Sequence, residues 1–302
     1  MGGSGGRSEY KSVNLKAQLL SSEQGTQSSQ RESEINEFLE ALLKDYNNRD
    51  VEAIKTHLEE IEKVLGREIE GIEKILFGGS ITKNTFVEGA SDVDALVFLD
   101  SSLYKNVNPN DLQNLFYQML QQRFPRTEIS KGELAVSVKF RDYEVQLLPA
   151  ILENGKVRIA NIEKSGWSTP INMAAFTDRL TRTNKMNNNK VVPVIKIAKD
   201  LFSRLPNEYQ ISGHHVEAIA VDAFSTYNGR YTLYEMTKHM LDYSTKRILS
   251  PINDVTGQSG VIDEYLGFAN SLNRQYLSSH IKDIAGRFSG TDAVSVTKDL
   301  FS

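Results

Sequence analysis

Apolar residues recur every three or four positions over residues 31–66, a spacing that predicts an amphipathic helix. The polar stretch 47–50 should divide this helix in two, with Asp50 as the N-cap of the second half and Gly66 as its C-cap. Residues 1–30 are rich in Gly, Ser and Gln, so we expect a flexible segment there, and its first few residues look like a linker or tag remnant.

The pattern between residues 72 and 159 changes to the short apolar runs and the alternation that are typical of β-strands. Alternation over 134–141 predicts a half-buried strand, and Asp142 would turn the chain into an antiparallel neighbour that ends at Pro149. One helix, stopped by Pro125, interrupts the strands. The expected strands are 72–77, 95–99, 134–141, 143–148 and 156–159, and the expected helix is 110–124.

From Thr169 onward the periodicity is helical, and no internal repeat is visible. Strands followed by a run of helices predict an α+β fold, with a small mixed sheet braced by an N-terminal helix, a helical domain, and the active site in the cleft between them. The expected helices are 170–184, 191–205, 214–227, 233–250, 262–272 and 273–288. The expected division is 1–30 as a flexible segment, 31–165 as the sheet domain with its N-terminal helices, and 166–302 as the helical domain.

Two aspartates stand at the head of an apolar run in the segment FGGSITKNTFVEGASDVDALVFL, residues 77–99. Because side chains two apart on a strand point to the same face, Asp92 and Asp94 should project side by side. Such a pair can share two divalent ions, as in phosphoryl-transfer enzymes, and its hard oxygen ligands suit Mg²⁺ or Mn²⁺ rather than zinc. A D-x-D pattern alone is more often a solvated turn.

A glycine-flanked serine precedes the aspartates, with eleven residues between Ser80 and Asp92. Gly78 and Gly79 would allow close approach of the backbone to a phosphate chain, and Ser80 would offer a hydroxyl and free N–H groups at a helix start. The P-loop pattern is absent. Serine turn and aspartate pair together predict a nucleotidyltransferase of the polymerase-β type.

This segment also resembles the motif of the cGAS/DncV-like nucleotidyltransferases and their oligoadenylate-synthase relatives. Lys83-Asn84-Thr85 lies where this group often carries K-G-T. The resemblance implies a polymerase-β-like sheet domain, a C-terminal helical domain and nucleoside triphosphate substrates. Looser similarity covers most of the chain from about residue 35, through 144–150, 167–184, the helix of Lys196, 212–224 and 251–266.

The chain departs from the family pattern at the strand that usually carries the third carboxylate. The family has V-D-h-h-P-A there, where h is hydrophobic, and this chain has VQLLPA over 145–150, with Gln146 in place of the acid. An amide is a neutral ligand and cannot act as a base toward a hydroxyl. Gln146 could be natural, could be an engineered inactivation, or could mark a nucleotide-binding relative that has lost catalysis. Glu144 could substitute if the strand register shifts.

Lysines in an apolar helix are the remaining chemical signal, since a buried lysine needs a partner. In relatives, a lysine of the helix that holds Lys196 points toward the nucleotide phosphates. Ser212 fits an N-cap and His215 fits packing, although both could contact nucleotide. The resemblance implies Gly78, Gly79, Ser80, Lys83, Lys196, Lys199 and Ser212 as nucleotide-binding residues, Asp92, Asp94 and Gln146 at the catalytic positions, and Asp92 and Asp94 as ligands of Mg²⁺ or Mn²⁺.

Composition narrows the function classes. The 302 residues contain no cysteine, which excludes disulfides and cysteine catalysis and fits a cytoplasmic protein. A formal net charge of −4 argues against long nucleic acid as a partner, although residues 179–204 hold seven basic side chains and one acid, either a solvated face or a wall toward phosphates. No apolar run approaches a membrane span, no signal peptide is visible, and the histidines lack a zinc-binding spacing.

Three functions compete. The leading hypothesis, implied by the resemblance, is a synthase that makes a cyclic or linear oligonucleotide second messenger from nucleoside triphosphates. Its setting would be bacterial antiphage (CBASS-like) signalling, with a possible protein regulator and a downstream effector that reads the product. The second hypothesis transfers nucleotide to a protein or RNA end. The third is a non-catalytic nucleotide-binding protein, in which Gln146 marks the loss of activity.

Overall fold

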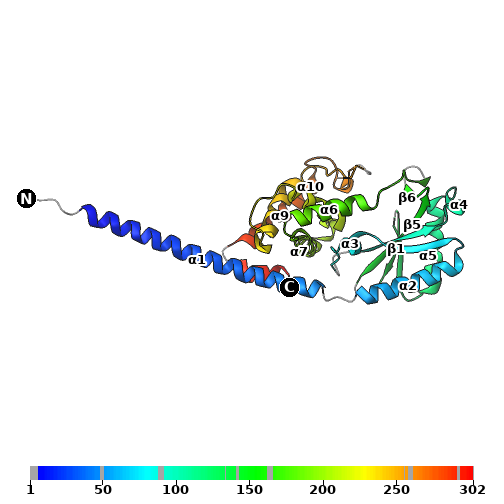
Figure 1. Ribbon diagram of the computed structural model, residues 1–302, viewed down its shortest axis with the longest axis horizontal. Helices are drawn as coiled ribbons and strands as arrows, with labels where there is room; N and C mark the ends of the chain where they lie inside the picture. Colours follow the sequence, from blue (N-terminus) through cyan, green and yellow to red (C-terminus); the bar gives the residue numbers. More distant parts are fainter. Residues whose placement is uncertain are drawn as a thin grey trace, which may run out of the picture.

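The computed structural model describes residues 6–47, 51–87, 92–132, 134–140, 143–161, 166–254, 256–257, 261–290 and 293–301. A twisted sheet lies at one end of the molecule, a bundle of helices lies beside it, and the long helix α1 runs along the bundle and projects beyond it (Figure 1). The predicted α+β class is therefore correct. The turn at Asp142 and the N-cap at Asp50 lie outside the described residues.

The sheet has the strand order β1-β2-β5-β4-β3, and β6 and β7 extend it from β5. Of the described pairs, β2 and β5 run parallel and the others are antiparallel. The bounds are β1 (Ile72–Phe77), β2 (Val93–Leu99), β3 (Glu128–Lys131), β4 (Val136–Lys139), β5 (Glu144–Glu153), β6 (Lys156–Asn161) and β7 (Gly166–Trp167).

Strand β5 runs through Pro149, where the sequence predicted its end. On one edge β5 pairs with β4 as far as Leu147 and then with β6 from Ala150. Pro149 thus lies where the antiparallel partner changes, a position at which a missing N–H donor is tolerated. Sequence reasoning also missed β3, whose side chains are mostly exposed and show no apolar alternation, and β7, which has only two residues.

Helices α2 (Val51–Glu68) and α5 (Pro109–Arg123) cover one face of the sheet and share a buried apolar core with it. Odd-numbered β2 residues from Val93 to Leu99 enter this core, as does Val145 of β5. Because side chains alternate along a strand, Asp94 and Gln146 project from the opposite face. The burial of apolar residues therefore fixes the direction of the polar ones.

A second core lies among the helices that follow the sheet. Ile35, Leu39 and Leu43 of α1 are buried in it, so α1 packs on the helical part and α2 is the helix that braces the sheet. The bounds are α1 (Gly6–Asn47), α3 (Gly79–Thr82), α4 (Ser101–Tyr104), α6 (Ala174–Met186), α7 (Val191–Ser203), η1 (Asn207–Tyr209), α8 (Gly213–Ala223), α9 (Leu233–Arg247), η2 (Glu264–Leu266), α10 (Leu272–Ser289) and α11 (Ala293–Leu300).

Three predictions along the helices differ clearly from the structure. Residues 6–30, where the sequence predicted flexible chain, belong to helix α1, because extending an existing helix is cheaper than starting one, and residues 1–5 lie outside the described residues. Gly66 lies inside α2, which ends at Glu68. The helix expected over 262–272 is replaced by the short turn η2, because Asp263 turns inward to bind other buried groups.

Among the described residues, no helix combines the length and apolar character needed to span a membrane. The proposed division at residues 30 and 165 remains a prediction.

Candidate active site

The parallel pairing of β2 with β5 assembles the three predicted catalytic positions. Asp94 is the direct register partner of Gln146, and Gln146 Nε2 donates a hydrogen bond to Asp92 Oδ2 at 2.9 Å. The same register leaves Glu144 two residues earlier, opposite Lys139 of β4. Gln146, and not Glu144, therefore stands beside Asp94, and the register shift considered from the sequence does not occur.

The glycine-serine turn packs directly against these carboxylates. Gly78 N donates to Asp94 O at 2.8 Å, and the buried Ser80 donates its hydroxyl to Asp92 O at 3.1 Å. Gly79 has φ +52°, and a Cβ placed there would lie 1.6 Å from Asp94 Oδ2. Only glycine fits this position, both in backbone conformation and in space. The structure thus brings the predicted phosphate turn and the predicted metal ligands together.

The two carboxylates are held in an environment that disfavours their negative charge. Burial raises the pKa of Asp92 to about 6, and the nearby Glu144 and Asp94 add to this effect. Burial also raises the pKa of Asp94, against the opposing charge of Lys83. A bound dication would relieve this repulsion, and carboxylate oxygens with the amide oxygen of Gln146 are the hard donors that Mg²⁺ prefers. The residues present fit a divalent cation, although the described chain offers no cluster of three acidic or histidine side chains.

A buried glutamate, which sequence reasoning missed, joins this turn to the helical part. Glu217 of α8 is 1% exposed and accepts from Lys83, from the hydroxyl of Thr85 and from Lys199 Nζ, the last at 2.8 Å. Lys199 also donates to Thr85 O at 3.1 Å. Burial alone would raise the pKa of Glu217, but the ammonium groups of Lys199 and Lys83 lower it to about 2. The carboxylate is therefore charged and bound to both lysines.

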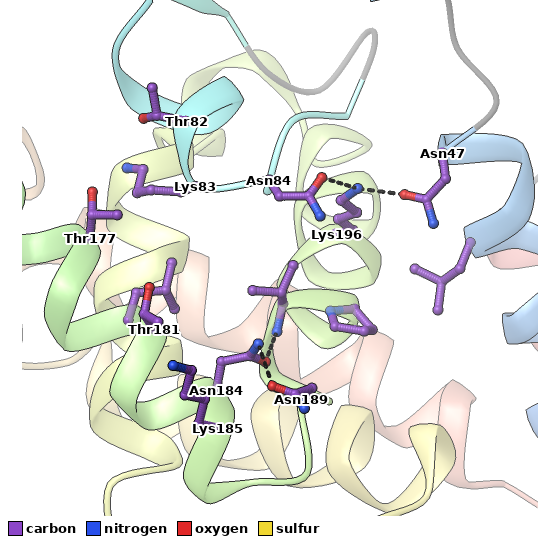
Figure 2. A pocket seen from close by; sticks show the side chains of 14 residues that line it. Asn47, Thr82, Lys83, Asn84, Thr177, Thr181, Asn184, Lys185, Asn189 and Lys196 are labelled. Atoms are coloured by element: carbon purple, nitrogen blue, oxygen red, sulfur yellow. Dashed lines mark hydrogen bonds between the residues drawn. The ribbon is translucent and has the colours of Figure 1, made fainter.

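Lys196 lies one helical turn before Lys199 but belongs to different surroundings. Its Nζ donates to Asn47 Oδ1 at 2.7 Å and to Asn84 Oδ1 at 3.4 Å, as Figure 2 shows. It lines a cavity of about 400 Å³ between α1, α3, α6 and α7. The structure thus brings Lys83 and Lys199 together on Glu217, whereas Lys196 contacts Asn47 and Asn84 and shares the lining of the cavity with Lys83.

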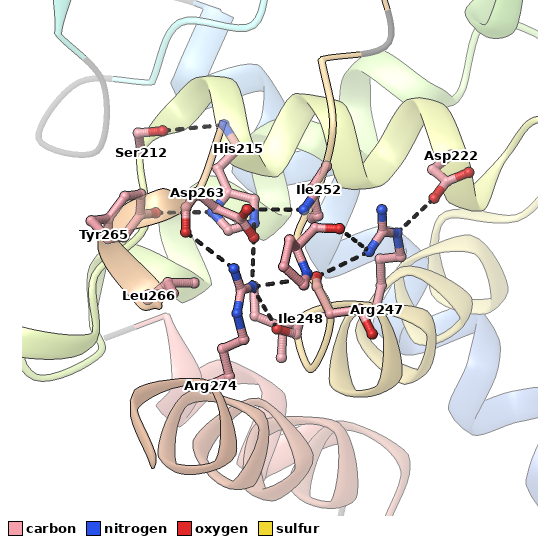
Figure 3. A network of polar contacts seen from close by, with 12 residues as sticks. Ser212, His215, Asp222, Arg247, Ile248, Ile252, Asp263, Tyr265, Leu266 and Arg274 are labelled. Atoms are coloured by element: carbon pink, nitrogen blue, oxygen red, sulfur yellow. Dashed lines mark hydrogen bonds and ion pairs between the residues drawn. The ribbon is translucent and has the colours of Figure 1, made fainter. Parts of the chain in front are cut away.

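A second buried polar network supports the start of α8 (Figure 3). Ser212 is its N-cap, accepting from His215 N at 3.2 Å, and His215 Nδ1 lies 2.9 Å from the hydroxyl of Tyr265. Asp263 accepts from Arg274 Nη1 at 2.6 Å, and both side chains are fully buried. Burial lowers the pKa of His215 to about 4, so the ring is neutral at physiological pH. The predicted capping and packing roles are confirmed, whereas a nucleotide contact of Ser212 remains a prediction.

Comparison with known proteins adds the family. A profile of the SMODS family, the Second Messenger Oligonucleotide or Dinucleotide Synthetase domain, matches residues 30–184, just over half of the chain. The chain belongs to this family. Within it, the protein is a cGAS/DncV-like nucleotidyltransferase, as the motif of residues 77–99 predicted. A search of curated protein sequences finds no match to the chain.

Several solved structures share the fold. The Vibrio cholerae DncV cyclic AMP-GMP synthase, in complex with nonhydrolyzable GTP, has a TM-score of 0.60 at 12% identity, covering 97% of this chain and 90% of its own. The Elizabethkingia meningoseptica CdnE cyclic dinucleotide synthase, with GTP and Apcpp, has a TM-score of 0.56 at 14% identity, covering 77% and 92%. The E. coli MS115-1 CdnC:HORMA-deltaN complex scores 0.53 at 14% identity, covering 85% and 90%.

One residue of this SMODS protein explains a departure from the family motif. Asn84, where the group often carries glycine, has φ +55°, in the left-handed region that asparagine tolerates better than most residues. Unlike glycine, it contributes a side chain, and its amide oxygen accepts from Lys196. The positive φ was foreseeable from the K-G-T comparison, but the contact with Lys196 was not.

Proposed function

We propose that this protein joins nucleoside triphosphates into a cyclic or linear oligonucleotide second messenger and releases pyrophosphate. The observation that carries the proposal is the β2–β5 register, which sets Asp92, Asp94 and Gln146 side by side against the turn of Ser80 in a SMODS chain. This arrangement offers oxygen ligands and a close-fitting backbone turn on one face of the sheet.

Asp92 and Asp94, with the amide oxygen of Gln146, would hold Mg²⁺ or Mn²⁺. The bound cation would supply charge neutralisation at the reacting phosphate. Gln146 now presents its nitrogen to Asp92, so its amide would turn to present Oε1 as a ligand. Gly79, which leaves no space between the turn and Asp94, would keep the phosphate chain and the carboxylates in contact.

The predicted phosphate contacts are the backbone of Gly78 and Gly79 and the hydroxyl of Ser80. Lys83 and Lys199 would add one net positive charge beside them, since Glu217 balances one of the two ammonium groups. A preorganised positive field of this kind favours the binding of a triphosphate without rearrangement of the site. The predicted contact of Ser212 would place the start of α8 beside the nucleotide.

The reaction would proceed by attack of a ribose hydroxyl oxygen on the α-phosphorus of the donor triphosphate. A new phosphorus–oxygen bond forms, the bond to the β-phosphate oxygen breaks, and pyrophosphate leaves. The hydroxyl proton goes to water, because the amide of Gln146 cannot accept it.

The biological setting is proposed from the neighbouring structures. The CdnC complex with a HORMA protein supports a protein regulator for this chain, and the synthases with bound nucleotides support nucleoside triphosphate substrates. We place the protein in the cytoplasm, in an antiphage pathway whose effector reads the oligonucleotide product.

The Gln146–Asp92 hydrogen bond also favours a second candidate, a nucleotide-binding protein without turnover. The N–H that Gln146 donates engages an oxygen of Asp92 that would otherwise be available as a metal ligand. This candidate predicts triphosphate binding with no pyrophosphate release, in Mg²⁺ and in Mn²⁺.

Thin-layer chromatography of phosphatase-treated reactions tests these functions. Each α-labelled nucleoside triphosphate is supplied singly and mixed, with Mg²⁺ or Mn²⁺, to the parent, to Asp92→Ala and to Gln146→Asp. A phosphatase-resistant small product from the parent, absent in Asp92→Ala, supports the synthase. Label on protein or RNA without a small product would replace it by transfer to a macromolecule. Product from Gln146→Asp alone supports the second candidate.

A further inference from the structure

An exposed apolar surface, called the α10 patch below, covers η2, the loop after it and the first turns of α10. Its members are Tyr265, Phe268, Leu272 and Tyr276. Phe268 is 80% exposed, Leu272 is 68% exposed, and the two tyrosines are each more than half exposed. Four of the ten exposed large apolar side chains in the described part of the chain thus fall within residues 265–276. Apolar groups that gather on a surface in this way mark an interaction site, whereas scattered ones do not.

The α10 patch continues along the helix and onto the neighbouring turn η1. Leu272 and Tyr276 are four residues apart on α10, so their side chains lie on the same face of the helix. The ring of Tyr209 in η1 lies 6.0 Å from the ring of Tyr276 and 5.1 Å from that of His280. Aromatic and aliphatic side chains from two elements therefore form one continuous surface.

Charged side chains are nearly absent from this surface. Residues 265–281 contain one Asp, Glu, Lys or Arg, namely Arg274, which is fully buried, although 25% of the whole chain is charged. The exposed polar positions within this range are uncharged amides and a hydroxyl: Asn270, Asn273, Gln275 and Ser279. Exposed charges return at both ends, with Glu264 and Lys282. An uncharged apolar centre with a charged rim is typical of a protein–protein interface, and it offers no basic groups to a phosphate backbone or an anionic lipid.

The buried Arg274 holds this surface in place from beneath. Its guanidinium group donates to Gly267 O at 3.0 Å and to Asp263 Oδ2 at 2.6 Å, and Figure 3 shows it extending from α10 toward Asp263. These contacts fix the segment that carries Tyr265 and Phe268 at both of its sides. A surface ordered in advance loses little conformational entropy when a partner binds, which favours association.

The charge of the chain indicates a second copy of itself as the partner. Its formal net charge is −4, so two copies repel each other where charged faces meet, and an uncharged face lets them approach without this cost. Asparagine, glutamine and serine side chains both donate and accept hydrogen bonds. A surface that carries them is complementary to itself, as the contact of a twofold-symmetric dimer requires.

We propose that the α10 patch is the contact surface of a homodimer, in which α10 of one copy packs against α10 of the other. Each of the three aromatic side chains of the patch has a surface of about 150–250 Å². Because all three and Leu272 are more than half exposed, the patch offers several hundred Å² of apolar surface. Stable interfaces bury about 800 Å² on each partner, so the patch with its polar surroundings is large enough for one.

Sedimentation equilibrium of the full chain over about 1–100 µM tests this contact, because interfaces of this size bind at micromolar concentrations or below. The mass of one chain is 33.9 kDa, and the parent should approach twice this mass as the concentration rises. Phe268→Asp and Leu272→Asp place like charges on both facing surfaces and should keep the mass of one chain throughout. Both side chains are largely exposed, so the melting temperatures should not change. Met186→Asp, at a 70% exposed position on α6, should dimerise as the parent does.

Chemical cross-linking locates the contact directly, and neither measurement requires turnover. The chain has no cysteine, so Ser279→Cys introduces the only thiol that a bifunctional maleimide can join between two copies. We expect cross-linked dimer from Ser279→Cys and none from Met186→Cys. A parent that stays monomeric at the highest concentration would overturn the proposal and leave the patch to a different protein. A dimer that persists in both aspartate variants of the patch, or equal cross-linking from the two cysteine variants, would overturn it by placing the contact elsewhere.

Discussion

Gln146 Nε2 lies 2.9 Å from Asp92 Oδ2, so the third position of the site donates a hydrogen bond to the first carboxylate. An aspartate at this position could only accept, and two carboxylates at that distance repel each other unless a cation or a proton lies between them. The amide therefore makes the site stable without metal and reduces the negative charge that would attract it.

Replacing Gln146 by aspartate should lower the stability of the metal-free protein and raise its activity with Mg²⁺. Without divalent cations, Gln146→Asp should lower the melting temperature by about 2–4 °C for each 1 kcal/mol of added repulsion. With Mg²⁺ the melting temperature should return to that of the parent. The rate of pyrophosphate release should rise by about tenfold or more, which corresponds to an activation free energy lower by about 1.4 kcal/mol. Gln146→Asn, which remains neutral, is the matched control. An unchanged rate and an Mg²⁺-independent melting temperature would contradict this account.

Gly79 should tolerate no side chain. Gly79→Ala introduces a Cβ where Asp94 Oδ2 lies, in a backbone conformation that costs other residues about 1–2 kcal/mol. We expect lower stability in urea unfolding and loss of pyrophosphate release, because Asp94 must move. Gly78→Ala is the control, since its nearest neighbour would be 3.7 Å away and its φ is −117°. Equal activity of the two variants would show that Asp94 is not held by this turn.

Removing the charge of Glu217 should destabilise the protein strongly. Glu217→Gln keeps the shape but leaves Lys83 and Lys199 without their carboxylate, and breaking a buried ion pair costs about 3–5 kcal/mol. The control is Glu128→Gln, because the Glu128–Lys139 pair is exposed and such pairs contribute about 1 kcal/mol or less. Urea unfolding at neutral pH measures the unfolding free energy of both variants. A similar decrease in the two would contradict the prediction.

The same variant has an acid signature. The pKa of Glu217 falls from its ordinary 4.5 to about 2 in the folded protein, so its contribution to stability is complete above pH 4.5 and disappears as pH falls toward 2. The difference in unfolding free energy between parent and Glu217→Gln should therefore narrow across this window. A difference that stays constant from neutral pH to about pH 3 would mean that packing, not charge, causes the loss.

Metal binding at Asp92 should weaken in mild acid. Its pKa is raised to about 6, so protons compete with a cation as pH falls through that value. Mg²⁺ should raise the melting temperature at about pH 7.5 and have little effect at about pH 5. Without metal, the pH dependence of stability has the opposite sign. Because the pKa of Asp92 is higher in the folded protein than in the unfolded chain, its ionisation destabilises the fold above about pH 6, and stability increases as pH falls toward 3.8.

Asp92→Asn provides the control for both effects. In Asp92→Asn, Mg²⁺ should not raise the melting temperature at either pH. Without metal, this variant should also lack the increase in stability that the parent shows as pH falls from 6 to 3.8. Asp111→Asn, on the far helix α5, should behave as the parent does. An equal Mg²⁺ effect in Asp92→Asn would place the cation elsewhere.

The sheet and the juxtaposition of Asp92 with Asp94 were predictable because their signals are local, whereas Gln146 was placed by the family resemblance. Alternation gave β4, an apolar run gave β2, and the spacing of Asp92 and Asp94 determined their shared face. The contacts of Glu217 were not predictable, since its partner Lys83 is 134 residues away in the chain. An acid within the apolar helix α8 was the available signal, because such a charge needs a buried partner.

Lys196 and Lys199 show a different limit. Three residues apart on α7, they point about 60° from each other around the helix axis, so periodicity places both on the same general side. Which one meets the phosphate turn and which one meets the cavity depends on where α1, α3 and α8 pack. These contacts are decided by tertiary packing, which a local sequence pattern does not contain. The same holds for Asp263, whose inward position takes the place of the helix expected over 262–272.

The short helix α3 is fastened at both ends, and this limits how the molecule can move. Gly78 and Ser80 tie it to β2 through backbone atoms of Asp94 and Asp92, while Lys83 and Thr85 tie its far side to Glu217 in the helical part. Rotation of the sheet against the helices must pivot about this point or break a buried ion pair. A hinge motion that admits substrate would therefore open the opposite side of the cleft and leave the phosphate turn in place.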